Sequence, residues 1–169
     1  MATFGNTVET WDGSSYAADS IWMGKFTLAE AGDVSKLTAF VDAWAPCAAR
    51  GVIYADSSGK PGTLLGAAET LFETHQTPYW ADFTFATAIA LTAGDYWLGV
   101  HLDANEQMGL FRWASAGTSY NAWDTYADGT ATTCPASASN THLYLIYATY
   151  STTPSGISIP LLNHLLLGD

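Results

Sequence analysis

Positive charge is the scarcest property of this sequence. The 169 residues include 5 lysines and arginines against 16 aspartates and glutamates, which gives a formal net charge of −11. A nucleic-acid-binding protein needs a basic surface that neutralises phosphates, and this composition cannot supply one. The same negative charge disfavours anionic membrane surfaces. We therefore expect no nucleic-acid partner and no membrane partner.

Targeting and membrane-spanning signals are also missing. Residues 1–20 contain no basic segment followed by an apolar one, which a secretory signal peptide requires. The longest apolar stretch, 157–167, is interrupted by Pro160, Asn163 and His164 and is too short to span a bilayer. The sequence therefore predicts a protein that is made in the cytoplasm and does not use the general secretory route.

Cysteine is rare, with Cys47 and Cys134 as the two examples. Neither lies in a Cys-x-x-Cys pair or beside other metal-ligand residues, so zinc is not expected. Two free thiols are one interpretation, and it suits a chain without a secretion signal. The alternative is one disulfide closing a long loop, which would stabilise the fold by roughly 4 kcal/mol.

Catalytic signatures are absent as well. The carboxylates are scattered, mostly at turns, and the histidines show no metal-ligand spacing. No Gly-x-Ser-x-Gly motif and no phosphate-binding loop occurs. We therefore expect no enzymatic activity and no cofactor. Calcium is the alternative, because acidic loops attract hard cations; the candidate ligands would be Asp56, Asp103, Asn105 and Asp128.

What the sequence does have is apolar and aromatic residues, at 49% and 14%, with charged residues at only 12%. This balance predicts a well-packed domain whose surface is formed by small polar residues. Short stretches of β-branched, aromatic or alternating residues, separated by turn residues, predict β-strands. They are Ile21–Leu28, Val34–Val41, Arg50–Asp56, Tyr79–Phe85, Tyr96–Leu102, Met108–Ala114 and His142–Tyr150. The pattern indicates an all-β fold, an antiparallel β-sandwich or barrel, over residues 1–151.

Three connecting segments carry further expectations. Residues 56–62 combine Asp, Ser, Gly and Pro between two apolar runs, which predicts a hairpin turn. Residues 63–73 have a helix-like composition, but Gly66 and the neighbouring strands favour an extended segment. Residues 44–49 and the long polar stretch 115–139 are predicted to be loops, and a loop as long as the second is uncommon unless it is functional.

The aromatic residues are the best candidates for binding. Trp22, Trp80 and Trp97 lie in alternating strands and are expected in the core. Other aromatic residues lie in or beside predicted loops, where rings can stack on sugars or contact a protein partner. The alternative is that they plug the ends of the sandwich. These candidate contact residues are Trp11, Trp44, Trp113, Tyr120, Trp123 and Tyr126.

Several motifs resemble a known family. A strand ends in IYAD (Ile53–Asp56), a GKPG turn follows at 59–62, WADFTF occupies Trp80–Phe85, and LTAGDYWL occupies Leu91–Leu98. Together with the opening ATFGNT, these motifs resemble the choice-of-anchor type of β-sandwich module, found in bacterial surface proteins and in small phage-encoded proteins. The resemblance covers Phe4 to Tyr150. It implies a jelly-roll-like sandwich similar to carbohydrate-binding modules, and it speaks for fold more than for function.

Residues 152–169 differ in character from the rest of the chain. A hinge-like TTPSG is followed by an apolar segment, in which Pro160 and Gly168 suit the start and end of a short helix. This tail either packs on its own domain or anchors the protein to a neighbouring subunit. Its candidate anchor residues are Ile157, Ile159, Leu161, Leu162, Leu165, Leu166 and Leu167.

These observations, with the resemblance, lead to one expected function and one alternative. The expected function is a non-enzymatic phage virion structural protein, a capsid decoration or accessory protein anchored by its tail and located in the virion. Its expected partners are the major capsid protein or another virion subunit, and further copies of itself in a homo-oligomer. The alternative is a carbohydrate-binding module that recognises polysaccharide through its loop aromatics.

Overall fold

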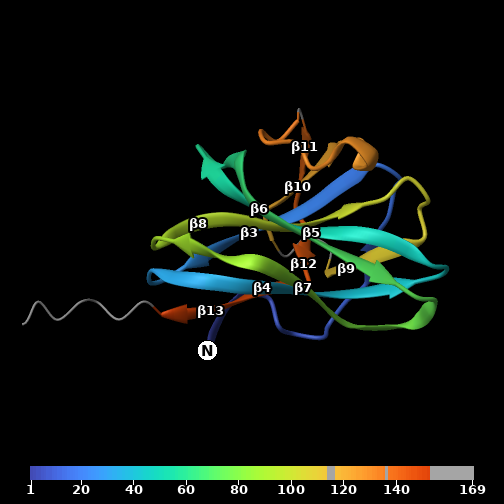
Figure 1. The fold of residues 1–169 in the computed structure, drawn as a ribbon, viewed down its shortest axis with the longest axis horizontal. Coiled ribbons are helices and arrows are strands. Elements are labelled where there is room, and N and C mark those ends of the chain that lie inside the picture. The colour runs from blue at the N-terminus through green and yellow to red at the C-terminus, as the bar shows by residue number, and fades with distance from the viewer. Residues whose placement is uncertain (114–116, 136, 153–169) are drawn as a thin grey trace, which may run out of the picture.

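Two antiparallel β-sheets pack face to face in the computed structural model, which describes residues 1–113, 117–135 and 137–152 (Figure 1). Sheet A has seven strands, in the order β1-β13-β4-β9-β12, with β2 beside β9 and β7 beside β4. Its strands are β1 (Ala2–Gly5), β2 (Gly13–Ser15), β4 (Gly32–Ala43), β7 (His75–Leu91), β9 (Met108–Trp113), β12 (Leu143–Tyr144) and β13 (Ile146–Thr152).

Sheet B has six strands, in the order β11-β10-β3-β8-β5-β6. Its strands are β3 (Ser20–Leu28), β5 (Cys47–Ser57), β6 (Lys60–Phe72), β8 (Gly94–Leu102), β10 (Ser119–Trp123) and β11 (Ser137–Asn140). A 3-10 turn, η1 (Tyr126–Asp128), follows β10. The predicted all-β sandwich is therefore confirmed. Among the described residues no helix is long and apolar enough to cross a membrane.

The predicted hairpin joins β5 to β6. Ser57 pairs with Lys60, which leaves Ser58 and Gly59 as the two central turn residues, with φ of 55° and 81°. Positive φ at both positions is the geometry that matches the right-handed twist of the two strands. The Asp56 carboxylate accepts a 3.0 Å hydrogen bond from the Gly59 amide, which closes the turn. Residues 60–72 are a strand, so the extended interpretation of this segment is confirmed.

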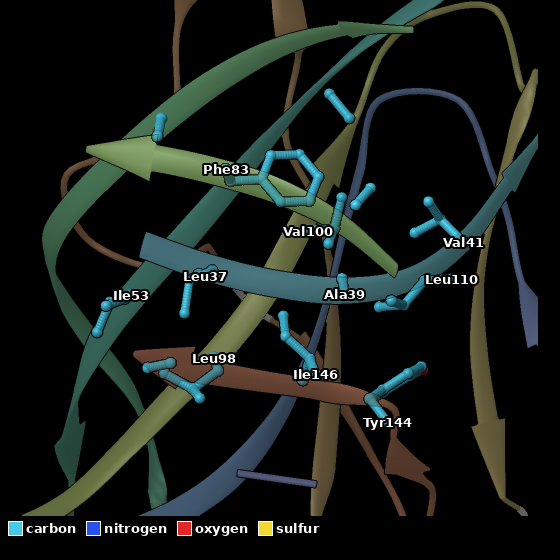
Figure 2. Close-up of a cluster of buried hydrophobic side chains, with 14 of the residues drawn as sticks. Leu37, Ala39, Val41, Ile53, Phe83, Leu98, Val100, Leu110, Tyr144 and Ile146 are labelled. Carbon is cyan, nitrogen blue, oxygen red and sulfur yellow. The ribbon is translucent and has the colours of Figure 1, made fainter. Parts of the chain in front are cut away.

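The main core lies between the sheets. Figure 2 shows side chains of β4, β5, β7, β8, β9 and β13 converging on this space. Along β4 the alternate residues Leu37, Ala39 and Val41 are fully buried in it, because successive side chains of a strand point to opposite faces. The intervening side chain Phe40 belongs to a separate cluster and points to the outer face of sheet A.

Each outer face carries a small hydrophobic cluster of its own. Outside sheet A the buried members are Phe40, Phe111 and Leu145, with Trp80 packed against them. Outside sheet B they are Ile21, Met23, Val52, Tyr54, Trp97 and Ala122. Side chains outside a sheet become buried only when another segment covers them. Two irregular segments do so here: residues 6–12, which we call the strap, outside sheet A, and residues 124–135, which we call the cover loop, outside sheet B.

The structure corrects three expectations. Residues 44–49 are only partly a loop, since β5 begins at Cys47. The predicted long loop 115–139 contains β10, η1 and β11, because β10 pairs with β3 and adds to sheet B. Trp80 is not in the main core but half-buried on the outer face of sheet A, since Ala81 and Phe83 take the inward positions. Residues 153–169 lie outside the described residues, as do the predicted helix and anchor residues of the tail.

Candidate functional site

The strap leaves β1 through Gly5 and crosses the outer face of sheet A, where it appears as the dark blue loop near β4 and β7 in Figure 1. Gly5 has a φ of 125°, and a side chain there would place its first carbon 2.5 Å from the Ile146 carbonyl oxygen. Only glycine accepts both conditions. The Asn6 amide then donates to the same carbonyl at 2.8 Å, and the Asn6 side chain caps the Val8 amide at 3.1 Å.

Aromatic rings form the surface on which the strap lies. Phe40 contacts Phe111 and Trp80, with ring centroids 5.5 and 5.1 Å apart, and Trp80 contacts Tyr147 at 5.2 Å. Trp11, from the strap, packs edge-on against Phe111 at 4.7 Å. These edge-to-face and tilted pairs are favourable beyond the area they bury. Aromatic packing through Trp11 therefore contributes to the attachment of the strap.

Polar contacts also hold the strap. The Trp80 indole donates to the Glu9 carboxylate, and the Asp12 amide donates to the Arg112 carbonyl at 3.2 Å. Both Glu9 and Asp12 are exposed, so water competes for these interactions. The strap covers part of the aromatic face and leaves Trp11 and Trp113 exposed to solvent.

A hollow of about 280 Å³ opens beside the strap, with Asn6, Val8, Thr10, Trp113 and Leu143 as its lining. Its wall is predominantly apolar. Val8 is 60% exposed and Trp113 is 38% exposed, so two large apolar side chains face solvent at one place. We call this feature the Trp113 hollow. Trp113 of β9 and Leu143 of β12 are distant in the sequence and are brought together in it because the two strands pair.

A second exposed aromatic feature lies where β4 ends and β9 begins. Tyr16 and Trp44 meet edge-to-face with centroids 5.4 Å apart, and they are 54% and 38% exposed. The Trp44 amide donates to the Gln107 carbonyl at 2.7 Å, which fixes the backbone beneath the ring. We call these two rings the Tyr16–Trp44 pair.

A buried carboxylate lies close to that pair. Asp42 is 7% exposed, and burial raises the pKa of its carboxyl group. Two hydrogen bonds lower this pKa in turn. The Gly109 amide donates to Asp42 Oδ1 at 3.1 Å, and the Trp44 side chain forms the second. Asp42 therefore links β4, β9 and Trp44 and serves to position the exposed ring.

The cover loop on the other outer face is held very differently. Arg50 donates to the Tyr126 carbonyl at 2.7 Å, and Tyr54 donates to the Ala131 carbonyl at 2.8 Å. His101 is fully buried, with Nε2 2.8 Å from the Asp124 carbonyl and Nδ1 3.1 Å from the Thr130 hydroxyl. Burial lowers the pKa of His101, so the neutral imidazole is favoured there. These are structural contacts between sheet and loop.

This arrangement sorts the predicted contact residues. Trp11 and Trp113 lie at the strap, Trp44 lies in the Tyr16–Trp44 pair, and Trp123 is 65% exposed at the end of β10. Tyr120 instead packs on Trp97 at 5.2 Å.

Tyr126 is only 9% exposed. The Arg50 guanidinium lies over its ring, 3.7 Å from the centroid, and its hydroxyl donates to Glu69 at 2.9 Å. The prediction that Tyr126 is a surface contact is therefore wrong, because the cover loop folds inward.

Sequence reasoning missed several members of the strap face. Val8, Leu143 and the underlying Phe40 and Phe111 were not candidates, and Trp80 was assigned to the core. Tyr16 was not among the candidate contact residues either. The available signal was the period-2 pattern, since Phe40 and Phe111 interrupt the outward polar positions that a solvated sheet face would show.

The described residues include both cysteines and the carboxylates considered as metal ligands. Cys47 and Cys134 are both free thiols, packed in the main core and in the cluster outside sheet B respectively. Burial raises the pKa of each thiol to about 11, so neither is a ready nucleophile. No group of three or more His, Cys, Asp or Glu side chains suited to a metal occurs in the described part of the chain.

The proposed calcium ligands are used elsewhere. Asp56 forms an ion pair with Lys25 at 3.2 Å and accepts from the Trp97 indole at 2.9 Å. Asp103 accepts from the Ala48 amide at 3.0 Å and from the Asn105 amide at 3.0 Å. Asp56 and Asp103 lie at opposite ends of sheet B, so these carboxylates do not form a calcium site together.

Comparisons with known proteins identify no relative: neither a family model, nor a curated protein, nor a solved structure matches this chain.

Proposed function

We propose that this chain is a non-enzymatic structural component of a phage virion, a capsid decoration or accessory protein held among its neighbours by residues 153–169. One observation carries the proposal. The described residues form a main core between the two sheets, and segments among them cover both outer faces. The sequence supplies seven further isoleucines and leucines after Thr152.

The composition of that segment supports an anchoring role. Residues 153–168 contain seven isoleucines and leucines and no Asp, Glu, Lys or Arg. Such a segment gains free energy by leaving water, at roughly 25 cal/mol per Å² of apolar surface buried. The net charge of −11 on the whole chain favours solubility of the free subunit. The expected partners are the major capsid protein or another virion subunit, including further copies of this chain.

The test compares two pairs of leucine substitutions in the full chain. Leu161→Ser with Leu162→Ser alters the proposed anchor, whereas Leu65→Ser with Leu71→Ser removes two leucines that are 37% and 78% exposed on β6. Both proteins should keep the circular dichroism spectrum of the wild type. We expect the first to lose incorporation into particles at least about tenfold and the second to incorporate normally. Normal incorporation of the tail variant would overturn the proposal.

A carbohydrate-binding function is the second candidate, and the Tyr16–Trp44 pair favours it. Two rings 54% and 38% exposed, set edge-to-face at 5.4 Å, offer apolar surface of the kind that packs on a sugar ring. Hydrogen-bonding groups lie in the same region, where Glu106 accepts from the Ala18 amide at 3.3 Å. The ligand class would be a polysaccharide.

A glycan array of the intact protein tests this candidate. We expect Trp44→Ala to abolish binding to any glycan that the wild type retains. Trp123→Ala removes another exposed tryptophan, at the end of β10, and should leave that binding unchanged. The absence of any glycan signal for the wild type, or equal binding by Trp44→Ala, would remove carbohydrate recognition from consideration.

A further inference from the structure

We propose that the Trp113 hollow receives the apolar segment 157–167 of a second copy of this chain. The inference rests on the proposed function, since it takes residues 153–169 as an anchor, and it adds the surface that the anchor binds. The same chain has an open apolar hollow and an apolar segment that could fill part of it.

The chemistry of the hollow selects the kind of occupant. Val8, Trp113 and Leu143 supply its apolar wall, while Asn6 and Thr10 contribute uncharged polar groups. A sugar would need several hydrogen-bonding partners, and a charged peptide would need opposite charges. An uncharged apolar segment needs neither, and residues 157–167 contain no Asp, Glu, Lys or Arg.

Position favours a neighbouring molecule over the same one. The hollow lies at the start of β13, where Asn6 donates to Ile146, while the chain leaves at Thr152, about 20 Å farther on at roughly 3.3 Å per residue. β13 lies within sheet A, between β1 and β4, and Thr152 pairs with Gly32 at the start of β4. A segment that binds its own hollow would have to reverse its direction at Thr152 and run back along the sheet, whereas a segment from a neighbouring copy would not.

Length and symmetry are compatible with such an exchange. Residues 153–169 can span at most about 60 Å when extended, at roughly 3.5 Å per residue, so the segment is long enough to extend beyond its own subunit. A tail bound in the neighbour's hollow is a head-to-tail contact, and repetition of such contacts closes into a ring when the rotation permits. The predicted assembly is therefore a cyclic homo-oligomer.

A mixing experiment with full-length variants tests the inference. Val8→Asp places a charge in the hollow at a side chain that is 60% exposed, so the fold should tolerate it. Leu161→Asp with Leu165→Asp disables the tail. Each variant should be monomeric by analytical ultracentrifugation, with association weakened at least about tenfold, whereas the wild type assembles. The matched control Leu71→Asp adds the same charge at an exposed leucine of β6 and should assemble like the wild type.

The decisive step is to mix the two defective variants. One retains an intact tail and the other an intact hollow, so together they should form a one-to-one heterodimer and nothing larger. A wild type that stays monomeric at every concentration, or a mixture that stays monomeric, would overturn the inference. If the tail variant fails to enter particles while Val8→Asp assembles normally, the proposed function stands and the hollow is not its receptor. If the tail variant enters particles normally, the proposed function fails instead.

Discussion

The two outer faces of the sandwich are both covered by irregular chain, yet they are covered in different ways. The cover loop outside sheet B is held by partly buried hydrogen bonds from Arg50, Tyr54 and His101 to its backbone carbonyls. The strap outside sheet A rests on aromatic rings and leaves Val8, Trp11 and Trp113 exposed. A buried polar contact is costly to break, whereas aromatic packing at a rim can be extended by a partner. This difference underlies our proposal that the strap face binds a partner and that the cover loop stabilises the domain.

The largest difference is expected between two tryptophans, one from each face. Trp97 is fully buried, packs on Tyr120 and donates to Asp56 at 2.9 Å, so Trp97→Ala should lower the free energy of unfolding by about 3–5 kcal/mol. Trp11 is 46% exposed, and Trp11→Ala should cost only about 1 kcal/mol. Urea unfolding measures both. Equal losses would contradict the division between the two faces.

A smaller loss is expected at Arg50. Its guanidinium donates to the Tyr126 carbonyl, pairs with Glu69 at 3.0 Å and lies over the Tyr126 ring. Arg50→Met keeps the aliphatic stem but removes all three interactions, which should lower the free energy of unfolding by about 2 kcal/mol. Limited proteolysis should then cut within residues 124–135 before the rest of the domain. Lys36→Met, which removes a partly exposed ion pair with Asp82, is the control and should cost less than about 1 kcal/mol.

The smallest effect is a dependence on pH that belongs to the cover loop. Burial lowers the pKa of His101 below its ordinary value of 6.5, although the Asp124 carbonyl and carboxylate oppose this shift. At pH values below about 6.5, the unfolded chain binds a proton at His101 more readily than the folded chain does. Stability is therefore fully present above about pH 6.5 and falls as the pH drops toward the folded pKa.

Thermal unfolding at several pH values measures this dependence. In His101→Gln the decline between neutral pH and pH 5 should become shallower than in the wild type. An unchanged slope in the variant would show that other groups, such as His142, whose pKa burial also lowers, cause the acid sensitivity.

The features of the two faces that could be predicted from the sequence are those that depend on residues close together in the chain. Alternation along a strand is a local property, so Val34–Val41 and Tyr96–Leu102 could be predicted as strands and the sandwich inferred from their number. The turn at Ser58 and Gly59 was equally local. Pairing of β10 with β3 joins Tyr120 to Met23, and nothing near Tyr120 reveals that partner. The stretch 115–139 was accordingly predicted as a loop.

The candidate site shows the same limit. Trp11 and Trp113 could be recognised as aromatic residues at segment ends. The hollow lined by Val8, Trp113 and Leu143 could not, because it exists only after β12 has paired with β9 and the strap has crossed sheet A. Tyr126 failed for the opposite reason, since its burial depends on Arg50 and Glu69 from the two strands beneath it.

We propose that the strap face binds a neighbouring subunit, whereas the cover loop stabilises the domain. Hydrogen–deuterium exchange of the full chain distinguishes the two faces when it is compared at concentrations where the protein is dispersed and where it is assembled. Assembly should slow exchange in residues 6–12 and at Leu143 and leave residues 124–135 unchanged. Slower exchange in residues 124–135 with no change in the strap would contradict the claim.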